Sequence, residues 1–327
     1  MTEATPASRR RPLAFLGRFA LIGVWAVMIA GFSLAMPHVF LSWANFTAMF
    51  GSSAPAAVLA IALIIPITAG DFDLSVGANL TLSACIIGVL NAQHGVPIGL
   101  AIVVAITAGA LVGMLNAVFI VGFAIPSLVV TLGTSSLLMG IVQWLTNSAT
   151  ISGISAGLVD AVVGLRVLGV PLAFFDVIVL AVLGFYVFEF TPLGRRLLFV
   201  GLGREVARLN GVDVGRVRGG ALVMAGLISA VAGVIYAGVL GSSDPSSGQN
   251  LLLPAFAAAY LGATTIFPGR FNPIGSVAAV YFLATGITGL TMLGVPLWAT
   301  DVFNGAALIL AVLISQVARG RSVADLV

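Results

Sequence analysis

Residues 191–218 read TPLGRRLLFVGLGREVARLNGVDVGRVR and hold six of the fourteen arginines of the chain. Long apolar runs flank this segment on both sides. Of the 327 residues, 60% are hydrophobic and 8% are charged, whereas about a quarter of the residues of a soluble globular domain are charged. The composition therefore predicts a polytopic membrane protein in which this segment is a loop between spans.

Apolar windows near 20 residues long, the length that crosses a bilayer as a helix, predict the transmembrane helices. Ten are expected, at residues 14–36, 48–69, 74–91, 97–121, 126–146, 172–190, 219–241, 252–267, 273–292 and 302–318. The eighth is short for a full crossing, and only residues 70–73 separate the second from the third, so eight to ten crossings with broken or re-entrant helices fit the pattern. We predict one all-α membrane domain over residues 1–327.

The arginines predict the orientation of this domain, because basic residues in short loops favour the cytoplasmic side. With the N-terminus inside, thirteen of the fourteen arginines lie inside and only Arg166 lies outside. Residues 1–13 are then a cytoplasmic tail, the C-terminus is cytoplasmic, and residues 191–218 form a cytoplasmic loop. The longest external loop, near residues 147–171, is expected to contain a short surface helix.

Small residues recur every four positions along the predicted span 97–121, at Ala105, Gly109, Gly113 and Ala117. This spacing puts them on one face of a helix and allows a second backbone to approach closely. We therefore expect this face to pack tightly against another span.

A helix of about two turns is predicted within the arginine-rich loop, ended by an Asn-Gly pair that favours a left-handed stop. Val206, Leu209 and Val212 make an apolar ridge at three-residue spacing. A helix this short needs a surface to pack on, which the protein's own spans, anionic lipid or a partner subunit would supply. The segment consists of Gly203, Arg204, Glu205, Val206, Ala207, Arg208, Leu209, Asn210 and Gly211.

Catalytic and metal motifs do not fit this sequence. Residues 153–157 spell G-x-S-x-G, but they lie in a loop rather than in the strand-to-helix turn of a hydrolase. The two histidines, His38 and His94, lack the spacing of metal ligands. All fourteen basic residues are arginine, so the lysine of a P-loop is missing. We predict no catalytic residue, no metal site, no nucleic-acid partner and no nucleotide hydrolysis by this chain.

Several stretches, taken in order, resemble the permease family of ribose-type ABC importers. Residues 70–77 (GDFDLSVG) resemble its GGIDLSVG signature, with Asp71 in place of the second glycine, and residues 125–134 (IPSLVVTLGT) resemble its PFIVTLGT run. Residues 261–272 are similar to its late Gly-rich stretch. The arginine-rich loop resembles the family segment T-x-x-G-R-x-L-x-A-x-G, continued through x-N-x-x-A-A-x-x-S-G-I. It agrees at Thr191, Gly194, Arg195, Leu197, Gly201, Ala207 and Gly211, and departs at Val200, Arg204, Val206 and Asn210.

The resemblance implies an ABC importer permease fold and an alternating-access mechanism without covalent chemistry on this chain. It implies that residues 203–211 are the coupling helix, seated in a separate cytoplasmic ATPase subunit that binds ATP and Mg. An extracytoplasmic solute-binding protein and a second permease copy, in a homodimer or heterodimer, complete the expected assembly in the bacterial cytoplasmic membrane. The implied cargo is a monosaccharide or a related small polar solute. The flanking arginines are interpreted as membrane-surface anchors: Arg195, Arg196, Arg216 and Arg218.

Polar residues near the breaks in the spans are candidates for shaping a translocation pathway: Asp73, Asn116, Thr131 and Thr134. Hydrogen bonding between helices is the alternative role, and the pattern favours it for each. The main rival function is a stand-alone carrier or channel, and the third is an intramembrane enzyme. An ion-coupled carrier usually needs an ionisable group deep in the membrane, and no acid clearly lies there.

Overall fold

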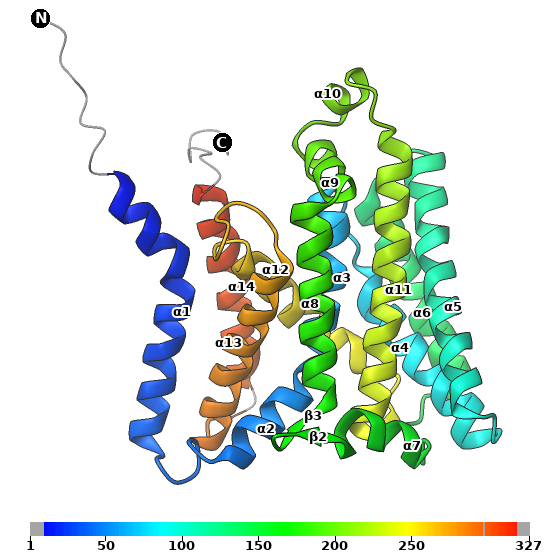
Figure 1. Ribbon diagram of the computed structural model, residues 1–327. Helices are drawn as coiled ribbons and strands as arrows, with labels where there is room; N and C mark the ends of the chain where they lie inside the picture. The colour runs from blue at the N-terminus through cyan, green and yellow to red at the C-terminus, as the bar shows by residue number, and fades with distance from the viewer. Residues whose placement is uncertain (1–9, 297, 319–327) are drawn as a thin grey trace, which may run out of the picture.

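Helices make up nearly all of the regular structure in the computed structural model, which describes residues 10–296 and 298–318 (Figure 1). Side chains are described for residues 21–296 and 298–315. The α-helices are α1 (Arg10–Ala35), α2 (Trp43–Ser52), α3 (Ala54–Thr68), α4 (Ser75–Ile87), α5 (Ile98–Ala117), α6 (Ser127–Thr146), α7 (Ala156–Val159), α8 (Leu172–Phe190), α9 (Pro192–Leu202), α10 (Arg204–Leu209), α11 (Val214–Leu240), α12 (Ser247–Gly262), α13 (Pro273–Met292) and α14 (Trp298–Ala318).

Three α-helices end in a wider π-helical turn. These turns are η1 (Gly88–Gln93) after α4, η2 (Val118–Gly122) after α5 and η3 (Asp160–Gly164) after α7. Four two-residue strands form two antiparallel pairs, β1 (Ile151–Ser152) with β4 (Ser242–Ser243), and β2 (Arg166–Val167) with β3 (Val170–Pro171). The predicted surface helix of the external loop is α7 with η3.

Within the described residues, seven helices are long and apolar enough to cross a membrane, and the α2–α3 pair, bent by 42°, makes an eighth. The all-α class with broken helices is therefore confirmed. Among the described helices, α12 has 16 residues and is short for a full crossing, as predicted for the eighth span. Most boundaries lie within a few residues of the expected ones, and α8 and α13 coincide with predicted spans.

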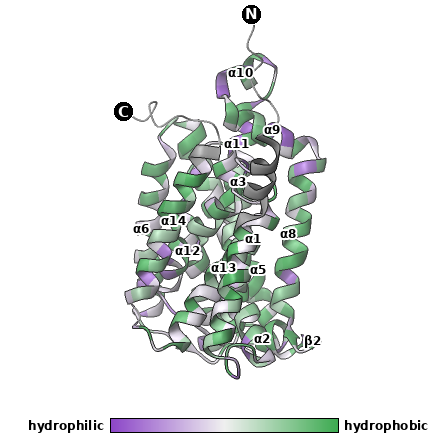
Figure 2. Ribbon diagram, turned by 90° about the vertical axis from the view of Figure 1, so that its left-hand side faces the viewer, coloured by the Kyte–Doolittle hydropathy of each residue, from purple (hydrophilic) through white to green (hydrophobic). Residues whose placement is uncertain are grey.

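Helix α3 lies in the middle of the bundle. Its residues from Val58 to Ile64 are buried on every face of the helix, as expected for a helix that is apolar all round. By contrast, 22% of the α8 span and 17% of the α14 span are buried. These outer helices carry hydrophobic residues along their length (Figure 2), which suits contact with lipid.

Helices α5 and α11 pack with their backbones in contact, along the small-residue face that the sequence predicts. A side chain built at Gly226 of α11 would put its Cβ 2.9 Å from the Cα of Gly113 on α5. Ala105, Gly109 and Gly113 are all buried there. We call this contact the α5–α11 seam, and it confirms the expected role of the four-residue repeat.

The two ends of the bundle differ in charge. Helices α9 and α10 project from one end, and α7, β2 and β3 lie at the other (Figure 1). The start of α1 and the end of α14 both lie at the end of the bundle that carries α10 (Figure 1). Arg166 of β2 lies at the opposite end from the arginines of residues 191–218, as predicted. Of the other arginines, Arg9 to Arg18, Arg319 and Arg321 have side chains outside the described residues, whereas the Arg270 side chain is described.

Candidate functional site

The predicted loop of residues 191–218 contains two short helices, α9 and α10, that protrude from the bundle. Thr191 caps α9 by accepting a hydrogen bond from the backbone N–H of Gly194, and Pro192 opens the helix. Helix α10 follows after Gly203 and stops where Gly211 takes a φ of +79°. The predicted short helix and its left-handed stop are confirmed, while the last five residues of the predicted loop belong to α11.

One side of α10 is anchored and the other is free. Ala207 is fully buried and packs in a small cluster with Val200 of α9 and Val214 of α11. Leu209 and Val206 are 79% and 55% exposed. An exposed apolar surface on a projecting helix is typical of a docking element.

The predicted apolar ridge is partly wrong. Val212 does not extend it, because this residue is half-buried against the anchoring cluster rather than in line with Val206 and Leu209. Leu202, at the end of α9, is 78% exposed at the same tip of the protein. The exposed apolar surface therefore begins before α10 and ends at Leu209.

The charged residues of α10 divide into two kinds. Arg208 pairs with Glu205 at 3.3 Å, and both side chains are mostly exposed, at 67% and 71%. Arg204 instead points back to the bundle, where its Nη2 donates to the backbone oxygen of Gly70 at 2.7 Å and to Asp71 Oδ1 at 2.9 Å. The sequence analysis placed both arginines around the apolar ridge, whereas in the structure only Arg208 stays on the exposed side of α10.

Arg218 is not a membrane-surface anchor. Its side chain is 14% exposed and donates two hydrogen bonds to Asp71, from Nε at 2.6 Å and from Nη2 at 2.8 Å. Asp71 itself is 2% exposed. A carboxylate buried so completely requires charged or hydrogen-bonding partners. The need to pair Asp71 explains why Arg204 and Arg218 both point into the bundle. The other arginines first interpreted as anchors, Arg195, Arg196 and Arg216, are exposed.

The turn between α3 and α4 places Asp71 and Asp73 on opposite sides of the break. Gly70, at a φ of +81°, closes the end of α3, and the N–H of Asp71 bonds back to the oxygen of Pro66. Asp73 accepts hydrogen bonds from the N–H and the hydroxyl of Ser75, the first residue of α4, at 2.9 and 2.6 Å. The Asp71 carboxylate therefore binds the arginines of α10 and α11, whereas the Asp73 carboxylate binds the start of α4.

A chain of hydrogen bonds joins α4, α5 and α6 beyond Asp73. Asn116 of α5 donates to the Ser75 hydroxyl at 2.8 Å and accepts from the Thr134 hydroxyl of α6 at 2.7 Å. All members are buried. We call Asp73, Ser75, Asn116 and Thr134 the polar network.

Thr131 lies beside the polar network, and its hydroxyl donates to the oxygens of Ser127 and Phe72 at 2.9 and 3.4 Å. The structure thus brings the four predicted pathway residues together. Their hydrogen bonds join α4, α5, α6 and the turn between α3 and α4. Hydrogen bonding between helices is the alternative role that the sequence analysis favours for these residues.

Asn79 is a buried polar residue that the sequence analysis missed. Its amide nitrogen donates to the oxygens of Gly109 and Gly226 and to the hydroxyl of Ser229, at 3.3, 2.9 and 2.8 Å. It therefore ties α4 to both sides of the α5–α11 seam. An asparagine in a span 72% buried inside the protein is the signal that could have found it.

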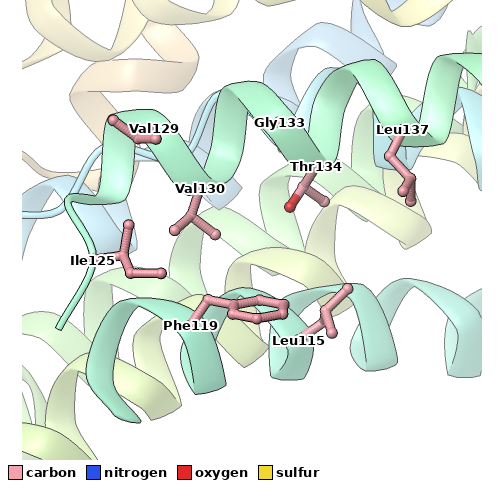
Figure 3. A pocket seen from close by; sticks show the side chains of 8 residues that line it. All are labelled: Leu115, Phe119, Ile125, Val129, Val130, Gly133, Thr134 and Leu137. Atoms are coloured by element: carbon pink, nitrogen blue, oxygen red, sulfur yellow. The ribbon is translucent and has the colours of Figure 1, made fainter. Parts of the chain in front are cut away.

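An apolar hollow of about 320 Å³ opens between the end of α5 and the start of α6 (Figure 3). Thr134 points into it, and its hydroxyl is already bonded to Asn116. A polar solute would find little to bind there. The hollow is lined by Leu115, Phe119, Ile125, Val129, Val130, Gly133, Thr134 and Leu137.

The opposite end carries a small polar cluster around Asp244. Its carboxylate accepts hydrogen bonds from the N–H and hydroxyl of Ser246, at 2.7 and 2.5 Å, and from the Thr150 hydroxyl at 3.0 Å. These hydrogen bonds, the Ser246 hydroxyl first, lower the pKa of Asp244 below its ordinary value. The cluster holds the loop after α6 in place where β1 pairs with β4.

Within the described residues, no group of three or more His, Cys, Asp and Glu side chains could hold a metal ion. Ser155, of the G-x-S-x-G stretch, caps α7 at the end of the bundle opposite α10 by accepting a hydrogen bond from the N–H of Gly157 at 3.3 Å. This serine has a structural role in the loop.

Comparison with known proteins places the chain in a family. Residues 45–312 match the family described as the branched-chain amino acid transport system / permease component. The chain belongs to this family. It is an ABC importer permease subunit, a multi-pass membrane protein that is not itself catalytic.

Relatives of this permease include autoinducer 2 import system permease proteins. LsrD of Escherichia coli (strain K12) is 33% identical over 272 residues, which are 81% of this chain and 80% of the relative. LsrD of Photorhabdus laumondii is 29% identical over 317 residues, 93% and 91% of the two chains. LsrC of Enterobacter sp. (strain 638) is 31% identical over 310 residues, 93% and 86%. No solved structure matches the permease.

Proposed function

We propose that this permease moves a monosaccharide or a related small polar solute into the cell by alternating access, driven by a separate ATPase subunit. The observation that carries the proposal is the projecting α10, anchored through Ala207 and exposing Leu209 and Val206. The chain has no lysine and hence no P-loop, so ATP and Mg belong on a partner chain. That partner would receive α10 in a groove.

We place α10 on the cytoplasmic side, because the end of the bundle that carries α10 also carries the arginines of residues 191–218, and basic residues favour the cytoplasmic side. The N- and C-termini are then cytoplasmic as well. The other end, with α7 and the cluster around Asp244, would face the extracytoplasmic solute-binding protein. The site is the bacterial cytoplasmic membrane.

We further propose that the permease pairs with a second permease chain. The permease is similar to both LsrD and LsrC. Both are named as permease proteins of an autoinducer 2 import system, which supports a system with two distinct permease chains. A homodimer is the other outcome that a purification with two differently tagged copies would detect. Autoinducer 2, named in these relatives, is a solute to test beside simple sugars.

Docking of α10 is tested by replacing Leu209 with glutamate and measuring how tightly the purified permease binds its partner ATPase subunit. Burying a new charge in the groove should weaken binding by roughly tenfold or more. Leu168→Glu is the matched control, since Leu168 is 87% exposed and lies in the β2–β3 turn at the opposite end.

Equal ATPase affinity of the Leu209→Glu and Leu168→Glu variants would contradict the proposal. Uptake into proteoliposomes tests the rival function. Uptake that proceeds without any ATPase and collapses with an ion uncoupler would identify a stand-alone carrier instead.

A further inference from the structure

Asp71 is shared by two arginines that lie on either side of the loop after α10. Arg204 is the first residue of α10, and Arg218 lies in the second turn of α11. Their guanidinium groups meet the same carboxylate, Arg204 at Oδ1 and Arg218 at both oxygens. Neither arginine belongs to the helices that Asp71 connects.

The two arginines differ in how firmly they are held. Arg218 is 14% exposed and makes a two-point contact, so removing it would leave the buried Asp71 with only the partly exposed Arg204 as an ionic partner. Arg204 is 43% exposed, so its guanidinium can regain water when it leaves. Asp71 would still keep Arg218. The Arg204 contact is therefore the releasable one.

The same turn holds α10 by further contacts. Arg204 donates to the backbone oxygen of Gly70, just past the C-terminal end of α3, where the helix dipole favours a cation. Gly201, near the end of α9, lies against the backbone oxygen of Thr68, where a side chain would not fit. The position of α10 thus depends on residues 68–71.

We propose that Asp71 is the positioning residue of α10, held permanently by Arg218 and released reversibly by Arg204. Asp73, two residues further on, begins the polar network of α4, α5 and α6. While Arg204 contacts Asp71, a displacement of α10 is transmitted to these helices through the turn between α3 and α4. This inference rests on the proposed docking function of α10.

The first test needs the permease alone, in nanodiscs. Cys85 is its single cysteine and is fully buried, so a nitroxide attaches selectively to a Leu209→Cys variant. In that background, Arg204→Gln should raise the population of the mobile spectral component about threefold to tenfold, with only a small loss of melting temperature. Arg204→Lys, which keeps the charge, should restore part of the immobilised component.

Arg216→Gln is the matched control, because Arg216 lies in the same segment, is 90% exposed and pairs with Asp213 on the surface. It should leave the spectrum unchanged. Asp71→Asn should raise the mobility of the spin label at position 209 at least as much as Arg204→Gln. If the Asp71→Asn variant does not fold, the Arg204→Gln variant still tests the inference. Unchanged mobility in Arg204→Gln would overturn the inference.

The second test measures solute transported per ATP hydrolysed by the complete importer. Arg204→Gln should lower this ratio severalfold because α10 no longer moves with the turn, and an unchanged ratio would overturn the transmission step. The two hypotheses fail separately. Normal ATPase binding by Leu209→Glu contradicts docking, whereas the spin-label result reports the Asp71 contact without any ATPase.

Discussion

Arg218 Nε lies 2.6 Å from Asp71 Oδ2, although 147 residues separate the two in sequence. With the second hydrogen bond, from Nη2 to Oδ1, this pair fixes the start of α11 to the turn after α3. Both side chains are removed from solvent, at 14% and 2% exposure. Such a pair is costly to break from one side, because the remaining charge stays buried.

Replacing Asp71 with asparagine should lower the free energy of unfolding by about 3 kcal/mol, since Arg218 loses its carboxylate. A maleimide dye that reacts with Cys85 only after unfolding measures the melting temperature, because Cys85 is buried. Arg204→Gln should cost less than about 1 kcal/mol, as expected for a half-exposed pair. Equal losses for the two variants would show that Arg218 does not depend on Asp71.

Gly226→Ala should destabilise the permease by about 1–3 kcal/mol through overpacking of the α5–α11 seam. The new methyl group would lie 2.5 Å from the oxygen of Gly109 and 2.9 Å from the Cα of Gly113. Gly220→Ala, on the same helix, has no neighbouring atom within 4 Å of the new methyl and should be tolerated. The same dye assay compares them, and similar melting temperatures would refute the close packing.

Asn116→Ala should remove both central hydrogen bonds of the polar network and cost about 1–2 kcal/mol. Because Asn116 joins α4 to α6, we also expect reduced solute uptake per folded permease. Thr107→Ala on the same helix removes an exposed hydroxyl bonded within the helix, to Val103, and is the control. A loss of uptake in both variants would point to α5 itself rather than to the network.

The Asp244 cluster predicts a pH effect at the external end. Because hydrogen bonds lower the pKa of Asp244 below its ordinary 3.8, ionised Asp244 stabilises the folded loop above that pH. This stabilisation is lost as the pH falls through the lowered pKa. Asp244→Asn should therefore increase hydrogen exchange of residues 147–155 at pH 6, and the difference from the unmodified protein should shrink below pH ~4. A difference that is independent of pH would exclude this role.

The spans were predictable because apolar runs of the right length leave few alternatives in a bilayer. Helix α8 coincides with residues 172–190, and the four-residue repeat of Ala105, Gly109 and Gly113 correctly predicted a tightly packed face. The partner of that face, Gly226, was not predictable, since spacing on one helix does not identify the helix opposite. Asn79 was missed for the same reason, as its bonds depend on which backbones meet around it.

The candidate site was predictable as a segment but not as a set of contacts. Gly211 correctly marks the end of α10, because a local backbone preference determines it. The predicted role of Arg218 as a membrane-surface anchor was wrong. All six arginines of the loop satisfy the positive-inside rule equally well, and that rule does not distinguish a solvated cation from a buried one. The family signature has a glycine where this chain has Asp71. This difference is the one sequence feature that indicated a buried ionic partner for an arginine.

The α5–α11 seam also limits how this protein can change shape. Where backbones touch, no side chains lie between the helices to change rotamer or slide, so this contact has one packing arrangement. With Asn79 bonded to both sides, α4, α5 and α11 form a rigid body. We therefore expect any rearrangement during a transport cycle to move this body as a unit against the outer helices.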